Sequence, residues 1–521
     1  MSQTNTLLSD AIERILANPS SEQAWHRFES LYVKPPAERH SEAVALFAAP
    51  ILDKGLPGFL RATLLARLPG GAGHLERAAE LLLANSPVDP DRICAFLLFA
   101  WGHLLAANAS HADFIAGITS ARFAALSQRA VHALQHQMPA LPQRPVTFVK
   151  RVALLTSHLG GLGHTPTRMV LDQFTVLHAL GYEVELFSAQ EQMPPDMNSY
   201  LGANCSSFTG PIDASQWSAY LNIGTPFSLD VHASDTRFSM LQRWRALRQQ
   251  IATFDPDLIF FVGLYEPMLL PLYQERPVLA LGTHAFAPVV PADAWLCADA
   301  AHTGLTERHW GLGLPASYAC DHPYRIRETS RAGGVDRAGL DLPADKLILI
   351  SVGARLPAEI VGPWAQAMLH VLAQQPNIVW LLVGGGGDMP AALADAAPGS
   401  VMTLAHQDDI GSVLAASDIY VNPPRIGGGF SVAEAMAASL PVVALRGADG
   451  GNKLGEMAAV SEDDYFLKLQ ALLENEASRK STGAQLRTVF EQTLSLANSH
   501  RSLDAAIAKT LELYQGRSGA S

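Results

Sequence analysis

The residues most suited to ligand chemistry stand in a glycine-rich segment, NPPRIGGGFSVAEAMAASLPVVAL, at residues 422–445. A strand is expected to end at about Val421, and a helix to begin near Phe430 or Ser431. The loop between them holds three glycines, Gly427, Gly428 and Gly429. Glycines let the backbone approach a ligand, and a helix N-terminus favours an anion such as a diphosphate. Glu434, one turn into the helix, could then accept hydrogen bonds from ribose hydroxyls; the alternative is an ordinary turn with a surface glutamate.

A second glycine-rich turn lies in LLTSHLGGLGHTPTRMV, residues 154–170, where a strand leads into a helix. Its glycines are Gly160, Gly161 and Gly163. His164 comes just before the helix and could act as a general base or hydrogen-bond a substrate. The alternative is that His164 only caps the helix. His158, at the strand end, is a weaker candidate of the same kind.

Two arginines are candidates for phosphate binding. Arg355 lies in ISVGARLPAEI, residues 350–360, at the end of an expected strand, and a guanidinium can pair with phosphate oxygens in a bidentate fork. Arg425, beside the glycine loop, is either a second ligand-binding cation or a member of a surface ion pair.

Two further motifs are set aside. LVGGGGDM, residues 382–389, is a lone glycine run after a strand, and we expect it to connect elements rather than to bind phosphate. Asp-Pro-Asp at residues 255–257 resembles a metal-binding carboxylate pair, but it precedes LIFFVG and is expected to be the turn into a strand. The sequence therefore predicts no metal site.

The elements that position these residues fall into distinct regions. Residues 1–145 show apolar residues at helical spacing and predict an all-helical domain that binds an acceptor or another protein. Residues 146–335 and 336–500 each alternate apolar strands with helices, which predicts two parallel α/β sheets buried on both faces. Residues 501–521 predict a final helix and tail. Ligands of such sheets bind at the carboxyl ends of the strands, so the site is expected between the two domains.

The composition argues against several classes of partner and location. The 521 residues carry a net charge of −12 with no basic stripe, which argues against nucleic acid and anionic lipid as partners. We find no signal peptide and no apolar run long enough to span a membrane. The four cysteines are scattered, as is typical of free thiols in a reducing compartment; they are Cys94, Cys205, Cys297 and Cys320. A cytoplasmic location is expected.

The segment at 422–445 resembles the nucleotide-sugar site of B-type glycosyltransferases, whose two Rossmann-like domains face each other across a cleft. The large retaining family has a Glu-x7-Glu pattern there; Glu434 fits the second glutamate, but Ile426 stands in place of the first. The spacing is closer to the O-GlcNAc transferase family. That resemblance implies that Gly429, Phe430 and Ser431 hold the diphosphate and that Glu434 binds the ribose.

Other segments extend the resemblance over residues 146–500. His164, Thr165, Pro166 and Thr167 are similar to a His-Pro-Thr-Ser-like loop of that family, which implies that Gly163, His164 and Thr165 face the sugar or the acceptor. Thr283 and His284 are implied on the acceptor side, with Arg425 near the sugar. Ala405 and His406 are implied beside the nucleotide base. The family often has a lysine shortly after the position of Arg355, where this chain has Ala358 and Glu359.

The helical N-terminus lacks a tetratricopeptide pattern and is similar to the helical domain of the bacterial adhesin N-glucosyltransferases. The resemblance implies inverting, metal-independent transfer of a GlcNAc- or glucose-like sugar from a UDP-sugar to a protein Ser, Thr or Asn side chain, with no cofactor. His164 and Arg355 would be the catalytic residues. Two alternatives remain: a glycan- or lipid-directed glycosyltransferase, and a catalytically silent protein-binding scaffold.

Overall fold

A computed structural model describes most of the chain. The described residues are 3–19, 21–32, 43, 46–47, 51, 53–68, 70–84, 92–93, 96–97, 99–100, 104, 117, 120–135, 138–190, 215–221, 223, 229–234, 240–283, 287–297, 304–306, 316–328, 337–384, 393, 399–407, 409–425, 427 and 429–519.

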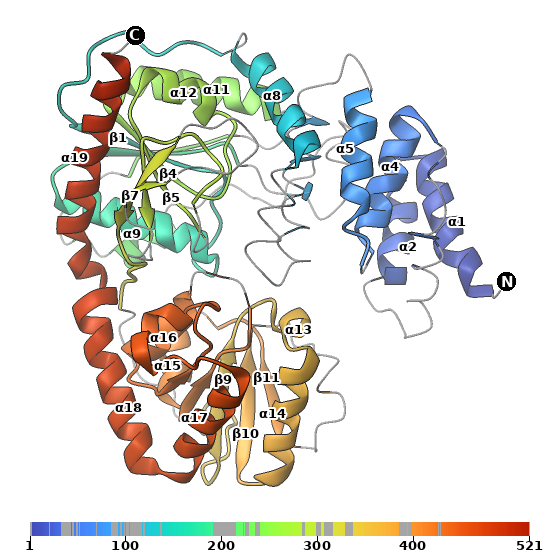
Figure 1. Ribbon diagram of the computed structural model, residues 1–521, viewed down its shortest axis with the longest axis vertical. Helices are drawn as coiled ribbons and strands as arrows, with labels where there is room; N and C mark the ends of the chain where they lie inside the picture. Colours follow the sequence, from blue (N-terminus) through green and yellow to red (C-terminus); the bar gives the residue numbers. More distant parts are fainter. Residues whose placement is uncertain are drawn as a thin grey trace.

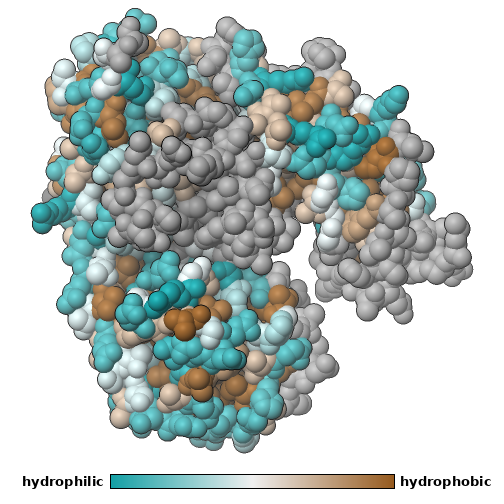
Figure 2. Space-filling model, viewed as in Figure 1, coloured by the Kyte–Doolittle hydropathy of each residue, from teal (hydrophilic) through white to brown (hydrophobic). Residues whose placement is uncertain are grey.

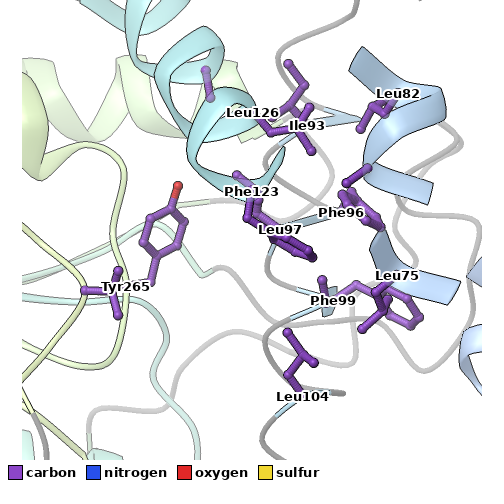
Figure 3. Packing of buried hydrophobic residues seen from close by; sticks show 14 of the residues in the cluster. Leu75, Leu82, Ile93, Phe96, Leu97, Phe99, Leu104, Phe123, Leu126 and Tyr265 are labelled. Atoms are coloured by element: carbon purple, nitrogen blue, oxygen red, sulfur yellow. The ribbon is translucent and has the colours of Figure 1, made fainter. Parts of the chain in front are cut away.

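The N-terminal region is helical, as its apolar spacing predicts. Its helices include α1 (Gln3–Ala17), α2 (Glu22–Tyr32), α4 (Gly55–Ala66), α5 (His74–Ala84) and α8 (Ala121–Gln135). An aromatic row fills its core: the ring centroid of Phe96 lies 5.4 Å from that of Phe59 and 5.9 Å from that of Phe123. Figure 3 shows Phe96 and Phe123 of this row, with Tyr265 of the neighbouring α/β domain on the other side of α8 from α5. The helical region thus packs against that domain through α8 and α12 (Leu269–Glu275).

The first α/β domain is built on an eight-stranded sheet in the order β3-β2-β1-β4-β5-β6-β8-β7. Its strands are β1 (Arg151–Thr156), β2 (Glu183–Ser188), β3 (Val231–Ala233), β4 (Leu258–Val262), β5 (Val278–Leu281), β6 (Ala294–Cys297), β7 (Gly304–Thr306) and β8 (Ser317–Asp321). The pairs are parallel except β7 with β8. Between the strands run α9 (Thr165–Ala179), α10 (Ser215–Leu221), α11 (Met240–Phe254) and α12.

The turn at residues 255–257 leads into β4, as expected. Asp255 pairs with Arg144 at 2.9 Å and with Arg276 at 2.7 Å, and Asp257 accepts hydrogen bonds from the backbone N–H groups of Lys150 and Arg151. These carboxylates therefore hold residues 144–151 against the turn that leads into β4.

The second α/β domain holds a five-stranded parallel sheet in the order β11-β10-β9-β12-β13. Its strands are β9 (Leu347–Val352), β10 (Ile378–Val383), β11 (Val401–Leu404), β12 (Ile419–Val421) and β13 (Val442–Val443). Its helices are α13 (Leu356–Glu359), α14 (Gly362–Gln374), α15 (Ile410–Ala415), α16 (Phe430–Ala437), the 3-10 helix η4 (Gly451–Met457), α17 (Glu462–Glu474) and α18 (Glu476–Val489). Separate apolar cores cover the two faces of the sheet, which explains why its strands are apolar throughout.

The last helix, α19 (Ser499–Ser518), returns to the first α/β domain. It packs against β5, β6, β8 and α9, and Arg517 near its end pairs with the buried carboxylate of Asp293. Figure 1 shows α18 and α19 running along one side of both domains, so the chain crosses between them twice.

The fold prediction of two parallel-sheet α/β domains behind a helical N-terminal region is confirmed. In the space-filling view, hydrophilic and hydrophobic side chains are interspersed over the visible face of the second α/β domain (Figure 2). Of the helices in the described ranges, none combines the length and the apolar character needed to cross a membrane.

Candidate active site at the domain junction

The glycine loop before α16 depends on glycine for steric reasons. Gly429 is the N-cap of α16 with φ +68, and a Cβ on it would lie 2.3 Å from Gly450 Cα. The Gly429 N–H donates to Asp449 Oδ1, and a Cβ on Gly427 would lie 2.5 Å from that same oxygen. The loop is thus pressed onto the Asp449–Gly450 turn. Gly428, also predicted to contact the ligand, lies outside the described residues.

Arg425 is buried, with 6% of its side chain exposed. Its guanidinium pairs with Glu359 at 3.1 Å and with Asp449 at 2.9 Å, and it donates to the Val352 carbonyl and to Ser431 Oγ at 3.0 and 3.1 Å. Burial lowers its pKa, but the fields of Tyr420, Asp449 and Glu359 outweigh that effect and raise the pKa above its ordinary value. The ion pairs are buried, so the surface ion pair considered from the sequence is wrong; they join the ends of β9 and β12 to the glycine loop. A contact of Arg425 with the ligand stays a prediction.

Ser431 and Phe430 begin α16, where the sequence predicts the diphosphate contacts. The Ser431 hydroxyl accepts from the Tyr420 hydroxyl at 2.8 Å as well as from Arg425. Its lone pairs are therefore used within the protein. Phe430 is partly buried, and Arg168 lies over its ring at 5.8 Å.

Arg355 is the exposed cation of this region. Almost half of its side chain, 47%, is open to solvent, and its Nη2 lies 3.0 Å from Glu359 Oε1. Glu359 therefore bridges Arg355 and the buried Arg425. A guanidinium that is accessible and at the end of β9 can turn to an incoming phosphate.

Glu434 is buried in α16 and pairs across the domain junction. Its Oε1 lies 2.6 Å from Nη1 of Arg168, which projects from α9 of the first α/β domain. Within the described part of the chain, no hydrogen bond reaches Glu434 Oε2, so this oxygen is the one available to a ligand hydroxyl. Sequence reasoning missed Arg168, although it stands one turn after His164 in the segment that was singled out.

His164 is the N-cap of α9 without capping the helix through its side chain. Its Nε2 lies 3.0 Å from Nε2 of His158, and its Nδ1 lies 2.8 Å from the Thr167 hydroxyl, which accepts from the Gly160 N–H. If that hydroxyl donates to Nδ1, the His164 proton sits on Nε2 and is donated to His158. Burial, together with the fields of His158 and Arg168, lowers the pKa of His164 to about 3, so the ring is neutral at pH 7.

The two domains also meet at Gly163 and His406. A Cβ on Gly163 would lie 2.6 Å from His406 Nε2, so the imidazole packs directly on the glycine turn. Ala405 and His406 are both exposed after β11. Thr165 Oγ1 accepts a 3.5 Å hydrogen bond from Arg168. His284 lies outside the described residues, next to Thr283 at the end of β5.

Lys453 is a second cation that sequence reasoning missed. It lies in η4, and a Cβ on Gly429 would be 2.8 Å from Lys453 Cε. Its place after a glycine-rich turn gave no signal in the sequence, because nothing there reveals that this turn folds onto the loop before α16. In the ranges that the structure covers, His, Cys, Asp and Glu form no group of three or more that could hold a metal ion.

Residues 348–475 match the protein-family model described as Glycosyl transferases group 1. Among solved structures, the chain is similar to an O-GlcNAc transferase mutant of Thermobaculum terrenum, with a TM-score of 0.51 and 15% identity over 99% of this chain and 100% of that one. It is also similar to a glycosyltransferase from Rickettsia africae, with a TM-score of 0.48 and 11% identity over 71% of this chain and 99% of that one. A search of curated proteins finds no match.

The family match runs from β9 to the end of α17 and includes Arg355, Arg425, Glu434 and Lys453. This segment is therefore similar to the group 1 glycosyltransferases, and the chain is an enzyme of the glycosyltransferase class. The likeness to the Thermobaculum terrenum structure agrees with the fold of two facing α/β domains.

Proposed function

We propose that this enzyme transfers a GlcNAc- or glucose-like sugar from a UDP-sugar to a Ser, Thr or Asn side chain of a protein, with inversion and without a metal ion. The observation that carries the proposal is the meeting of the two predicted site segments at one junction, through Arg168 with Glu434 and Gly163 with His406. The similarity to a structure described as an O-GlcNAc transferase mutant supports a GlcNAc-like sugar as the transferred group.

The donor would lie along the carboxyl edge of the second sheet. The N-terminus of α16 and Arg355 would hold the diphosphate, because backbone N–H groups and an accessible guanidinium both favour an anion. Glu434 Oε2 would accept from the ribose, with Oε1 fixed by Arg168. The exposed residues Ala405 and His406 would border the base.

The same groups would stabilise the leaving diphosphate. Charge grows on it as the bond to the sugar breaks, and donors already oriented toward that position favour the transition state. This is the role that a divalent cation has in other enzymes. The proposal requires no metal because Arg355 and the helix N-terminus supply the positive field.

His164 is best placed as a neutral hydrogen-bonding group beside the sugar or the acceptor. Its two ring nitrogens are engaged by His158 and Thr167, and the lowered pKa makes the ring a weak base. Proton abstraction by His164 requires that a substrate separate it from His158.

The test is donor turnover. Purified enzyme is incubated with UDP-GlcNAc or UDP-glucose and Ser-, Thr- or Asn-containing peptides, and UDP release and peptide mass are measured. We expect release coupled to peptide modification, reduced about 10- to 100-fold in Glu434→Gln by the loss of charged hydrogen bonds to the ribose. Glu474→Ala, an exposed site on α17, is the control. Modification of a glycan and not of peptides would refute the protein acceptor, and turnover unaffected by Glu434→Gln would refute the site.

A further inference from the structure

Lys453 projects its side chain onto the loop that begins α16. Its Cε occupies the space beside Gly429, whose positive φ and lack of a Cβ leave room for it. Its Nζ lies 5.2 Å from the ring centroid of Tyr324, whose hydroxyl donates to the Gly282 carbonyl at the end of β5. The ammonium group is therefore between the helix N-terminus and the first α/β domain.

Within the described ranges, this ammonium group forms no ion pair with a carboxylate. Among the residues that the structure describes, no carboxylate oxygen lies within 4.0 Å of Lys453 Nζ. Asp449 is the carboxylate whose field acts on it, but Asp449 is paired with Arg425 and accepts from the Gly429 N–H. Burial lowers the pKa of Lys453 to about 8, against the opposing field of Asp449. Lys453 is half-buried, and a partly desolvated cation that no described carboxylate pairs with is a candidate for binding an anion.

The charged groups near Lys453 pair with one another. Arg355 and Arg425 share Glu359, and Arg425 also pairs with Asp449. Among the described residues at the end of β9 and the glycine loop, these two arginines are matched by two carboxylates. Lys453 supplies the surplus positive charge that a diphosphate needs.

We propose that Lys453 binds the diphosphate of the donor. The inference rests on the proposed function, since it assigns a further residue to the same nucleotide-sugar site. A bound diphosphate would stabilise the charged ammonium, so binding near pH 8.5 takes up a proton. Among the described residues, Tyr324 and Asp449 are the titratable groups that face Lys453. Burial raises the pKa of Tyr324, so its hydroxyl is already protonated in this range, and Asp449 is paired with Arg425.

The test is calorimetric titration with UDP, inorganic pyrophosphate and uridine at pH 7.0 and 8.5, in two buffers of different ionisation enthalpy. Wild type is compared with Lys453→Met, Lys453→Arg and the control Lys480→Met, which removes an exposed lysine of α18. We expect Lys453→Met to lower the affinity for UDP and for pyrophosphate about 10- to 100-fold, because a charge-assisted hydrogen bond is lost, and to leave the affinity for uridine unchanged. Lys453→Arg should restore part of the affinity.

Proton uptake gives a reading that a merely structural role would not change. Wild type should take up a fraction of a proton on binding UDP at pH 8.5, and Lys453→Met should take up none. Equal UDP affinity and equal proton uptake in wild type and Lys453→Met, while wild type binds UDP, would overturn the assignment of Lys453 alone. Failure of wild type to bind UDP at all would overturn the proposed function and this inference together.

Discussion

The ion pair between Arg168 and Glu434 links the two α/β domains, and its strength can be worked from the structure. The two atoms Nη1 and Oε1 are 2.6 Å apart, with 18% and 6% of the side chains exposed. With charge centres about 4 Å apart, the attraction is about 4 kcal/mol at an effective dielectric constant near 20. Desolvation and side-chain ordering oppose this, so we expect a net coupling of about 2 kcal/mol, within the range for residues in contact.

The assay is a double-mutant cycle with Arg168→Met and Glu434→Gln, read as the free energy of unfolding in denaturant. Each single variant should lose about 3 kcal/mol, because it leaves one partly buried partner unpaired. The matched control is Lys150 with Glu183, which has the same 2.6 Å separation but 61% and 52% exposure. That exposed pair should couple by less than about 1 kcal/mol. Additive effects of Arg168→Met and Glu434→Gln would refute the account of this pair.

Three further outcomes follow from the site and its surroundings. Arg425→Met should destabilise the protein by about 3–5 kcal/mol, because it leaves Asp449 buried without its cation and removes one of the two arginine partners of Glu359. Arg355→Met, at a partly exposed pair, should cost less than about 1 kcal/mol of stability while weakening the binding of UDP, and equal losses of stability in chemical denaturation would contradict this. In thermal unfolding, Gly429→Ala should lose more stability than Gly447→Ala. Both positions have a positive φ, which costs an alanine about 1–2 kcal/mol, but only at Gly429 would the new Cβ also clash with the Gly450 backbone. Burial lowers the pKa of His322 to about 3, so the unfolded chain binds this proton more readily than the folded one. The free energy of unfolding should therefore fall by about 1.4 kcal/mol per pH unit as the pH drops below about 6.5. In urea titrations, His322→Asn should show a shallower fall between pH 6.5 and 5, and parallel curves for the variant and wild type would contradict the lowered pKa.

The alternation of apolar strands and helices was enough to predict both α/β domains. Runs such as LILISV and IVWLLV became β9 and β10, since strands covered on both faces must be apolar throughout. The glycine loop and the start of α16 at Phe430 were also predictable, because glycine and the following helical spacing are local signals.

The features that the sequence did not predict depend on contacts between segments that are far apart in the chain. Arg168 and Glu434 are 266 positions apart, and no local pattern joins them. Arg425 looked like a surface or ligand-binding cation because the sequence does not show that Glu359 and Asp449 converge on it. For the same reason the return of α19 to the first α/β domain was not predicted, although its helical character was.

The most direct measurement of the central claim is calorimetric titration of the purified chain with UDP in EDTA, repeated on Glu434→Gln. The account predicts one UDP bound per chain without a divalent cation, and an affinity about 10- to 100-fold lower in the variant, because a neutral amide replaces the carboxylate that accepts from the ribose. No binding by wild type with or without Mg²⁺, or equal binding by the variant, would contradict a nucleotide-sugar site at the start of α16.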